Sequence, residues 1–270
     1  MDYQYFKVEI KNKVATVTFN RAEKSNALHM PAWTEMKEIF NSLSEQSEVR
    51  AIVLAGEGKN FCAGIDLELL MSVGEYQKIE CAGRRSEAIR SLVLSLQEAV
   101  NAIEKCKKPV LAAVHGGCIG GGVDIVAACD IRYCTENAYF TIKEIDLGMV
   151  ADLGTLQRLP KLISPGMVSE MAYTGRKVQG KEAKEIGLVN QTYFSKDELL
   201  ESVTKLARTI ASKSPLSIRG TKEVLKYSRD HSVEDSLNYM ATWNAAMLLS
   251  DDLSEAFKAS MEKRSPDFKD

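Results

Sequence analysis

Residues 108–124 read KPVLAAVHGGCIGGGVD, and the fold class can be inferred from them and from the segments on either side. Its apolar run, residues 110–114, has the length of a buried strand and ends directly at a cluster of glycines. After the glycines we expect a helix to begin at residues 122–128, and residues 131–134 have the character of a further short strand. Strand, glycine turn, helix and strand in this order indicate an α/β layered core.

Upstream of this stretch the same alternation is present. Two β-rich segments, residues 6–10 and 14–19, are joined at Asn12 and Lys13, which predicts a hairpin. Periodicity then predicts a helix over residues 31–43, a buried strand over 51–55 and a largely helical region over 77–105. Residues 138–142 are expected to form another short strand.

Downstream of Asp152 the pattern becomes mostly helical. We expect helices over residues 170–174, 180–185, 197–211, 217–229, 233–248 and 251–262, interrupted by one strand over 188–194. We therefore divide the chain into a core of residues 1–196 and a helical region of residues 197–270. The amphipathic helices of the second region are expected to pack on the core or on another subunit.

Composition limits the possible partners. The 270 residues are 45% hydrophobic, enough for one large core, and the formal net charge is -2. This near-neutral charge does not predict binding to nucleic acid or to an anionic membrane. Any anionic ligand must therefore be bound by basic groups close to its own site. No apolar run of membrane-spanning length is present in the sequence.

Cysteine and histidine usage indicates neither a disulfide framework nor a metal site. The six cysteines show no CxxC spacing and are expected to be reduced and mostly buried. The three histidines are far apart and form no HExxH motif, so we expect no metal. Because the first residues resemble no signal or transit peptide and the last do not read SKL, we expect a cytoplasmic protein.

The glycine cluster at residues 116–122 fits a turn whose backbone N–H groups approach a ligand. It does not fit the dinucleotide pattern GxGxxG, since Ile119 interrupts it. Its alternative role is close packing of a strand end against a helix. Residues 61–67 (FCAGIDL) form a second such loop, in which Asp66 is expected to cap a helix.

Three acids, Asp124, Glu144 and Asp152, follow the glycines in a largely apolar stretch. Carboxylates in an apolar pocket lose hydration, so their pKa values rise and they can carry protons near neutral pH. Taken singly, each acid is better explained as a surface carboxylate or as the salt-bridge partner of a basic side chain than as a catalytic group. Together with the glycine turn, they predict an acid/base site beside an anion-stabilising backbone.

Four ordered motifs give the chain a resemblance to a known family. They are NRAEKSNAL at residues 20–28, FCAGIDL at 61–67, KPVLAAV with its glycines from 108, and ACDIR at 128–132. With these motifs the chain resembles the crotonase (enoyl-CoA hydratase/isomerase) superfamily. The resemblance implies a ClpP/crotonase-like spiral of β-β-α units with a C-terminal helical region, which serves trimerisation and covers the active site.

Within that superfamily the acids resemble those of delta(3,5)-delta(2,4)-dienoyl-CoA isomerases. Hydratase members carry glutamate at the positions of Asp124 and Glu144 and usually glycine at that of Asp152. The resemblance therefore implies isomerisation of 3,5-dienoyl-CoA to 2,4-dienoyl-CoA in fatty acid beta-oxidation. It assigns Glu144 to C2 and Asp152 to C6, with the two roles open to exchange, and places Asp124 between them.

The resemblance also implies how an acyl-CoA binds. The thioester oxygen would lie between the backbone N–H groups of Ile65 and Gly121, and coenzyme A is part of the substrate, with no separate cofactor. The residues that the resemblance places along the substrate and coenzyme A are Arg21, Lys24, Leu28, Ala63, Gly64, Asp66, Leu67, Gly122 and Lys263. Lys263 would come from the C-terminal helix of this chain or of a neighbouring subunit in a trimer or hexamer. Residues 69–74 and 77–90 are expected to form the acyl pocket walls.

Two other functions stay open at the level of sequence. The chain could be an enoyl-CoA hydratase or another crotonase-type acyl-CoA enzyme, or a crotonase fold retained as a non-catalytic binding subunit. The intact acidic trio argues against the second alternative. The third acid, Asp152, is the residue on which the choice between isomerase and hydratase depends.

Overall fold

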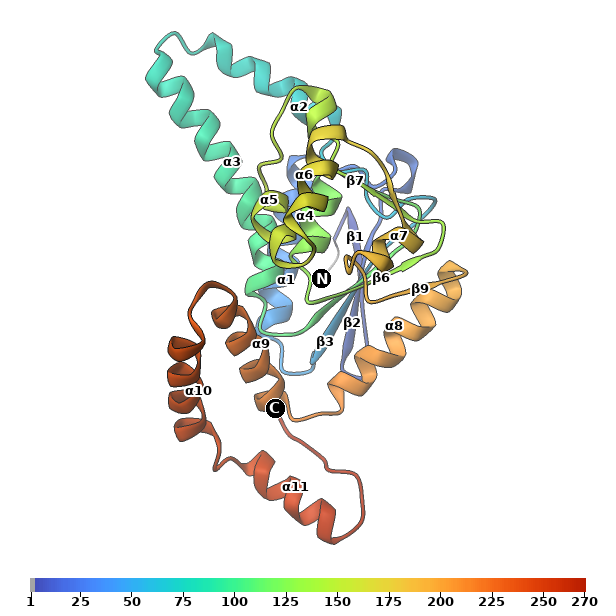
Figure 1. The fold of residues 1–270 in the computed structure, drawn as a ribbon, viewed down its shortest axis with the longest axis vertical. Helices are drawn as coiled ribbons and strands as arrows, with labels where there is room; N and C mark the ends of the chain where they lie inside the picture. The colour runs from blue at the N-terminus through green and yellow to red at the C-terminus, as the bar shows by residue number, and fades with distance from the viewer. Residues whose placement is uncertain (1–2) are drawn as a thin grey trace.

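The computed structural model describes residues 3–270 and confirms the predicted α/β core (Figure 1). Its main sheet has six strands in the order β1-β2-β3-β4-β6-β9, and every neighbouring pair is parallel except β1 with β2. These strands are β1 (Phe6–Lys11), β2 (Val14–Phe19), β3 (Ala51–Gly56), β4 (Val110–Val114), β6 (Ile131–Thr135) and β9 (Gln191–Tyr193).

The predicted hairpin lies at Asn12 and Lys13. Their φ angles of 54° and 63° place both residues in the left-handed region, as a two-residue turn between twisted antiparallel strands requires. The parallel pairing of β2 with β3 then needs a crossover, which α1 (Met30–Glu45) supplies. The β-β-α unit followed by a further strand is therefore confirmed.

The two faces of the main sheet are covered by different helices. Along β3 the side chains alternate: Ile52 and Leu54 join a core cluster with α1 and α3 (Ala82–Lys105), and Ala51 and Val53 face a second cluster. The second cluster is completed by buried apolar residues of α8 (Lys196–Ala211). A strand buried on both faces is the arrangement that a continuous apolar run predicts.

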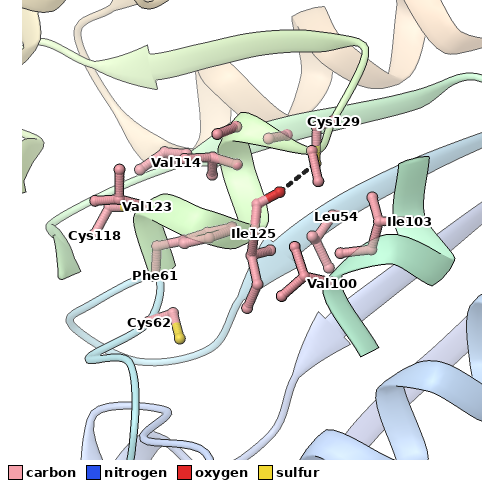
Figure 2. Packing of buried hydrophobic residues seen from close by; sticks show 14 of the residues in the cluster. Leu54, Phe61, Cys62, Val100, Ile103, Val114, Cys118, Val123, Ile125 and Cys129 are labelled. Carbon is pink, nitrogen blue, oxygen red and sulfur yellow. Dashed lines mark hydrogen bonds between the residues drawn. The ribbon is translucent and has the colours of Figure 1, made fainter. Parts of the chain in front are cut away.

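Helix α4 (Gly121–Ala127) starts at the glycine cluster, as predicted, and is buried along its whole length. Figure 2 shows its Ile125 beside Leu54 of β3 and Val100 of α3. The Cys129 thiol hydrogen-bonds the Ile125 carbonyl oxygen at 3.4 Å (Figure 2). All six cysteines are free thiols, and every one except Cys81 is buried. The short helix is thus held by the core on several sides.

A second, smaller sheet carries the glycine turn. It has the order β5-β7-β8 and consists of β5 (Gly117–Ile119), β7 (Tyr139–Thr141) and β8 (Val178–Gln179). The remaining short elements are η1 (Ala22–Lys24), η3 (Glu144–Leu147), α5 (Thr155–Arg158), η4 (Leu159–Lys161), α6 (Pro165–Thr174) and α7 (Gly180–Glu185). The glycine turn, η3 and α5 bring the three acids to one region.

An arm projects from the body at the top of Figure 1. It is formed by α2 (Leu67–Ser72), η2 (Val73–Lys78) and the N-terminal half of α3. The long helix predicted from residue 77 begins instead at Ala82, since the backbone at Ile79 and Cys81 is extended. The arm consequently has two limbs.

Three further helices follow α8, namely α9 (Pro215–Asp230), α10 (Val233–Met247) and α11 (Asp251–Met261). All four C-terminal helices begin at a capping serine whose side chain accepts a backbone N–H. Helices α10 and α11 lie at the opposite end of the molecule from the arm (Figure 1). The division at residue 196 stays a prediction, and α8, which begins at this residue, packs on the sheet. No helix within residues 3–270 has the length and apolar character needed to cross a membrane.

Candidate active site

A cavity of about 720 Å³ lies between the arm and the glycine turn. Its walls include Glu144 and Asp152, two of the three predicted acids, and both predicted oxyanion residues, Ile65 and Gly121. Leucine, isoleucine and valine side chains from α2, η2 and α3 form much of the remaining wall. The structure thus brings into one apolar cavity residues that are up to 129 positions apart in the chain, from Lys24 to Leu153.

The two loops predicted to supply oxyanion donors are bonded to each other. Cys62 N donates to Gly117 O at 3.1 Å, and Ile119 N donates to Cys62 O at 3.0 Å. Among residues 3–270, the N–H groups of Ile65 and Gly121 donate to no other group of the chain. Two unpaired donors on adjacent, mutually fixed loops are suited to hold a carbonyl oxygen as it gains negative charge.

Gly64 allows the two loops to approach. Its φ of +81° lies in the left-handed region, and a Cβ placed on it would lie 2.8 Å from Gly121 N and 2.6 Å from Ile119 O. A side chain here would strain the backbone and force apart the two predicted donors.

Gly120 leaves room for the Glu144 carboxylate in the same way as Gly64 leaves room for the second loop. Its φ is +50°, and a Cβ added to it would lie 2.9 Å from Glu144 Oε1. The carboxylate therefore lies directly against the glycine backbone. A bare glycine is required both for the conformation and for the space.

The Glu144 carboxyl is set up to exchange a proton near neutral pH. The residue is 8% exposed and its Oε2 has no hydrogen-bond partner in the described chain. Burial, followed by the nearby charges of Asp124 and Asp152, raises the pKa of Glu144 to about 7. This is the range in which a general base works best at physiological pH.

Asp124 lies beneath the cavity wall. It is 1% exposed, its Oδ1 accepts the Thr155 N–H at 2.6 Å, and its Oδ2 has no partner among the described residues. Burial raises the pKa of Asp124 to about 6, although hydrogen bonds from Thr155 act in the opposite direction. Its carboxyl therefore influences Glu144 electrostatically from below the cavity surface.

Asp152 lines the cavity from the loop before α5. Burial also raises its pKa. Its backbone carbonyl accepts a hydrogen bond of 2.6 Å from the Gln97 side chain of α3, which fixes the loop to the long helix. Two carboxyls with raised pKa values, Glu144 and Asp152, therefore share one cavity.

The predicted coenzyme A residues divide into two groups. Lys24, Ala63 and Leu67 line the cavity together with Asp66. Asp66 accepts the Glu68 N–H at 2.9 Å, which confirms the predicted helix cap. The same carboxylate is hydrogen-bonded by Arg21, which also donates to Ala27 O at 2.9 Å. The Arg21 guanidinium thus braces the loop from within.

The other predicted contacts do not form part of the cavity wall. Leu28 is buried and bridges to Ile65, which fixes the loop that carries the first donor. Gly122 packs against Cys62, whose carbonyl oxygen would lie 2.8 Å from an added Cβ. Lys263 follows α11 closely in the chain, and this helix lies far from the arm (Figure 1). Its contact with coenzyme A stays a prediction.

Sequence reasoning missed several residues that hold the site. Thr155 and Gln97 bind the acids or their loop, as described above. Arg158 donates to Glu104 Oε2 at 3.0 Å, and Glu104 is also paired with Arg229 of α9. Each pair is separated by 31 or more residues in the chain, and no local motif links its members.

Known proteins of similar sequence carry names that agree with this geometry. The chain is 49% identical to a delta(3,5)-delta(2,4)-dienoyl-CoA isomerase of Arabidopsis thaliana, named peroxisomal, with 98% of this chain and 97% of that protein covered. It is 46% identical to the mitochondrial isomerase of Mus musculus, with 97% of this chain and 82% of that protein covered. Among solved structures, an enoyl-CoA hydratase from Bacillus anthracis matches with a TM-score of 0.88 at 29% identity, covering 98% of this chain and 99% of the other.

These names correct one prediction. The expectation of a cytoplasmic protein is wrong, because the similar isomerases are named as peroxisomal or mitochondrial proteins. Compartment signals are read by receptors and take no part in the fold. Failure to recognise a signal in a sequence therefore does not indicate the cytoplasm.

The family itself follows from the whole length of the chain. The sequence profile described as Enoyl-CoA hydratase/isomerase matches residues 9–270. This match begins within β1 and covers the rest of the sheet, the glycine turn, the three acids and the C-terminal helices. The chain therefore belongs to the enoyl-CoA hydratase/isomerase family.

Proposed function

We propose that this protein is a delta(3,5)-delta(2,4)-dienoyl-CoA isomerase that acts in fatty acid beta-oxidation. The observation that carries the proposal is that Asp152 lines the same apolar cavity as Glu144, with both pKa values raised. Two such carboxyls allow one group to take the proton from C2 while the other gives a proton to the distant C6. The names of the similar proteins support this reaction.

In the proposed reaction, the Glu144 carboxylate removes a proton from C2 of the 3,5-dienoyl group. The electron pair moves toward the thioester oxygen and gives a dienolate, whose negative charge the N–H groups of Ile65 and Gly121 stabilise. One such donor contributes about 3 to 4 kcal/mol in other enzymes. Protonated Asp152 then supplies a proton to C6, and the double bonds shift to positions 2 and 4.

The position of Asp124 favours isomerisation over hydration. In the hydratase alternative, the residues at positions 124 and 144 would handle a water molecule together. The Asp124 carboxyl instead accepts a hydrogen bond from Thr155 and is absent from the cavity wall. We assign it the task of raising the pKa of Glu144 through its negative charge.

The coenzyme A end is proposed to leave the cavity near Lys24. Its side chain lines the cavity and is exposed, with Glu68 Oε1 at 3.8 Å from its ammonium group. Since α11 lies far from the cavity within one chain, contact by Lys263 would require a second copy. We propose a homotrimer or a hexamer in which α11 of one subunit reaches the active site of another.

The test is an assay of the purified protein with a 3,5-dienoyl-CoA and, separately, a 2-enoyl-CoA. We expect absorbance from the conjugated 2,4-dienoyl thioester to appear with the first substrate, and slow loss of conjugation at most with the second. Fast hydration without the diene shift would establish the hydratase instead. Tight coenzyme A binding without turnover of either substrate would indicate a binding subunit.

A further inference from the structure

One wall of the cavity follows helix α3. Four apolar residues of this helix line it, namely Ile89, Leu92, Val93 and Leu96. Their spacing of three, one and three positions places them on one helical face. Leu96 lies next to Gln97, which binds the Asp152 carbonyl, and Ile89 lies two turns further along the arm. The wall therefore leads away from the acids along the helix.

A second cavity of about 680 Å³ begins where the first one ends. Leu70, Val73 and Ile89 line both cavities, so these three side chains form a waist between them. The second cavity is more polar, because Tyr76, Gln77 and Arg85 complete its lining. The α2–η2 limb of the arm and the N-terminal half of α3 supply every lining residue of this cavity (Figure 1).

We propose that the two cavities form one acyl channel with a waist at Leu70, Val73 and Ile89. Medium-chain substrates end before this waist, and only long-chain substrates extend through it. This inference rests on the proposed function, which fixes C6 of the acyl chain beside Asp152. Carbons beyond C6 can then follow the apolar wall along Leu96, Leu92 and Ile89. The terminal part of a long chain lies past Ile89 in the second cavity.

The rise of α3 gives the number of acyl carbons that reach the waist, if C6 lies level with Leu96. From Leu96 to Ile89 the axis advances about 10 Å, at about 1.5 Å for each residue. An extended chain with carbon–carbon bonds of about 1.5 Å advances about 1.3 Å for each methylene, so about eight carbons cover this distance. A chain of about 14 carbons therefore ends at the waist. The next turn, to Arg85, adds about 6 Å and reaches a chain of about 18 carbons.

The waist is suited to be tested by substitution. Leu70, Val73 and Ile89 are each half-buried, so a larger side chain can be placed there without disrupting the main core. Ile89→Trp fills the waist with an indole ring. Arg90→Trp is the matched control, because Arg90 is the next residue of α3, is exposed and lines neither cavity.

The experiment compares kcat/KM for 3,5-decadienoyl-CoA and 3,5-octadecadienoyl-CoA in the wild type and both variants. Excluding a few methylenes of a substrate from an apolar site lowers kcat/KM by about tenfold or more. We expect Ile89→Trp to lower the value for the long substrate at least about tenfold while changing that for the short one less than about threefold. Arg90→Trp should leave the ratio of the two values unchanged.

Each other outcome has a defined meaning. If Ile89→Trp lowers kcat/KM equally for both substrates, or leaves both values unchanged, the channel does not pass the waist and the inference is wrong. A wild type that turns over the short substrate but not the long one would also overturn it. Absence of isomerisation with the short substrate would instead contradict the proposed function itself.

Discussion

Thr155 donates its backbone N–H to Asp124 Oδ1 at 2.6 Å, and this bond joins the helix after the glycine turn to the segment that carries Asp152. The bond holds a buried carboxylate below the active site without pairing it to a cation. Asp124 therefore retains its repulsion toward Glu144. One hydrogen bond thus fixes both the position of the acid and its electrostatic effect.

We expect Asp124→Asn to stabilise the protein at high pH. Because the folded pKa of Asp124 is raised to about 6, the protonated form is favoured by folding, and this contribution is lost as the pH rises through that value. The neutral amide should raise the free energy of unfolding by about 2 to 3 kcal/mol near pH 8, and by much less near pH 4. Urea unfolding at both pH values measures the difference. Equal effects at the two pH values would contradict the assignment of a raised pKa.

The same substitution should shift the pH dependence of catalysis. If Glu144 acts as the base, kcat/KM rises with pH through its pKa of about 7. Since the charge of Asp124 helps to raise this pKa, Asp124→Asn should move the midpoint to lower pH. A pH profile of kcat/KM with 3,5-decadienoyl-CoA measures the shift. An unchanged midpoint would show that the two carboxyls do not interact during catalysis.

Removing either proposed proton carrier should abolish most turnover. Glu144→Gln and Asp152→Asn each keep the shape of the side chain but cannot exchange a proton, so we expect turnover to fall at least about 100-fold in each. Glu68→Gln is the control, because Glu68 also lines the cavity but is highly exposed. Near-normal turnover in either of the first two variants would show that the residue is not a proton carrier.

Gly120→Ala should impair catalysis more than Gly148→Ala. Both glycines have positive φ, 50° and 71°, so an alanine strains the backbone at both positions. Only at Gly120 would the new Cβ meet Glu144, at 2.9 Å from Oε1, since nothing lies within 4 Å at Gly148. We expect kcat to fall by about tenfold or more beyond any loss in the control variant. Similar kcat values in the two variants would rule out a positioning role for the Gly120 backbone.

Arg158→Met should destabilise the fold. Arg158 and Glu104 are paired at 3.0 Å with side chains 10% and 18% exposed. Burial alone would raise the pKa of Glu104, but its hydrogen bonds with Arg158 and Arg229 outweigh burial and lower it. Loss of Arg158 leaves this carboxylate only partly compensated, and we expect a cost of about 3 kcal/mol. Denaturant unfolding of Arg158→Met and of Arg158→Met with Glu104→Gln tests this, since the second change should restore part of the loss.

Much of the fold could be predicted because its signals are local. The hairpin at Asn12 and Lys13, the strand after Pro109 and the helix after the glycines each depend on a few neighbouring residues. The start of α3 was predicted too early, because apolar periodicity does not show that the backbone is extended at Ile79 and Cys81. Boundaries depend on contacts made after the arm has folded.

The amino-acid sequence shows which chemical groups are available: a strand ending at glycines, a second loop of the same kind, and three acids in apolar surroundings. These are consequences of side-chain type and spacing. The packing of the folded chain places Glu144 and Asp152 in one cavity and Asp124 beneath it, held by Thr155. It also decided the pKa values, since burial and the distance between charges exist only after residues far apart in the chain have come together.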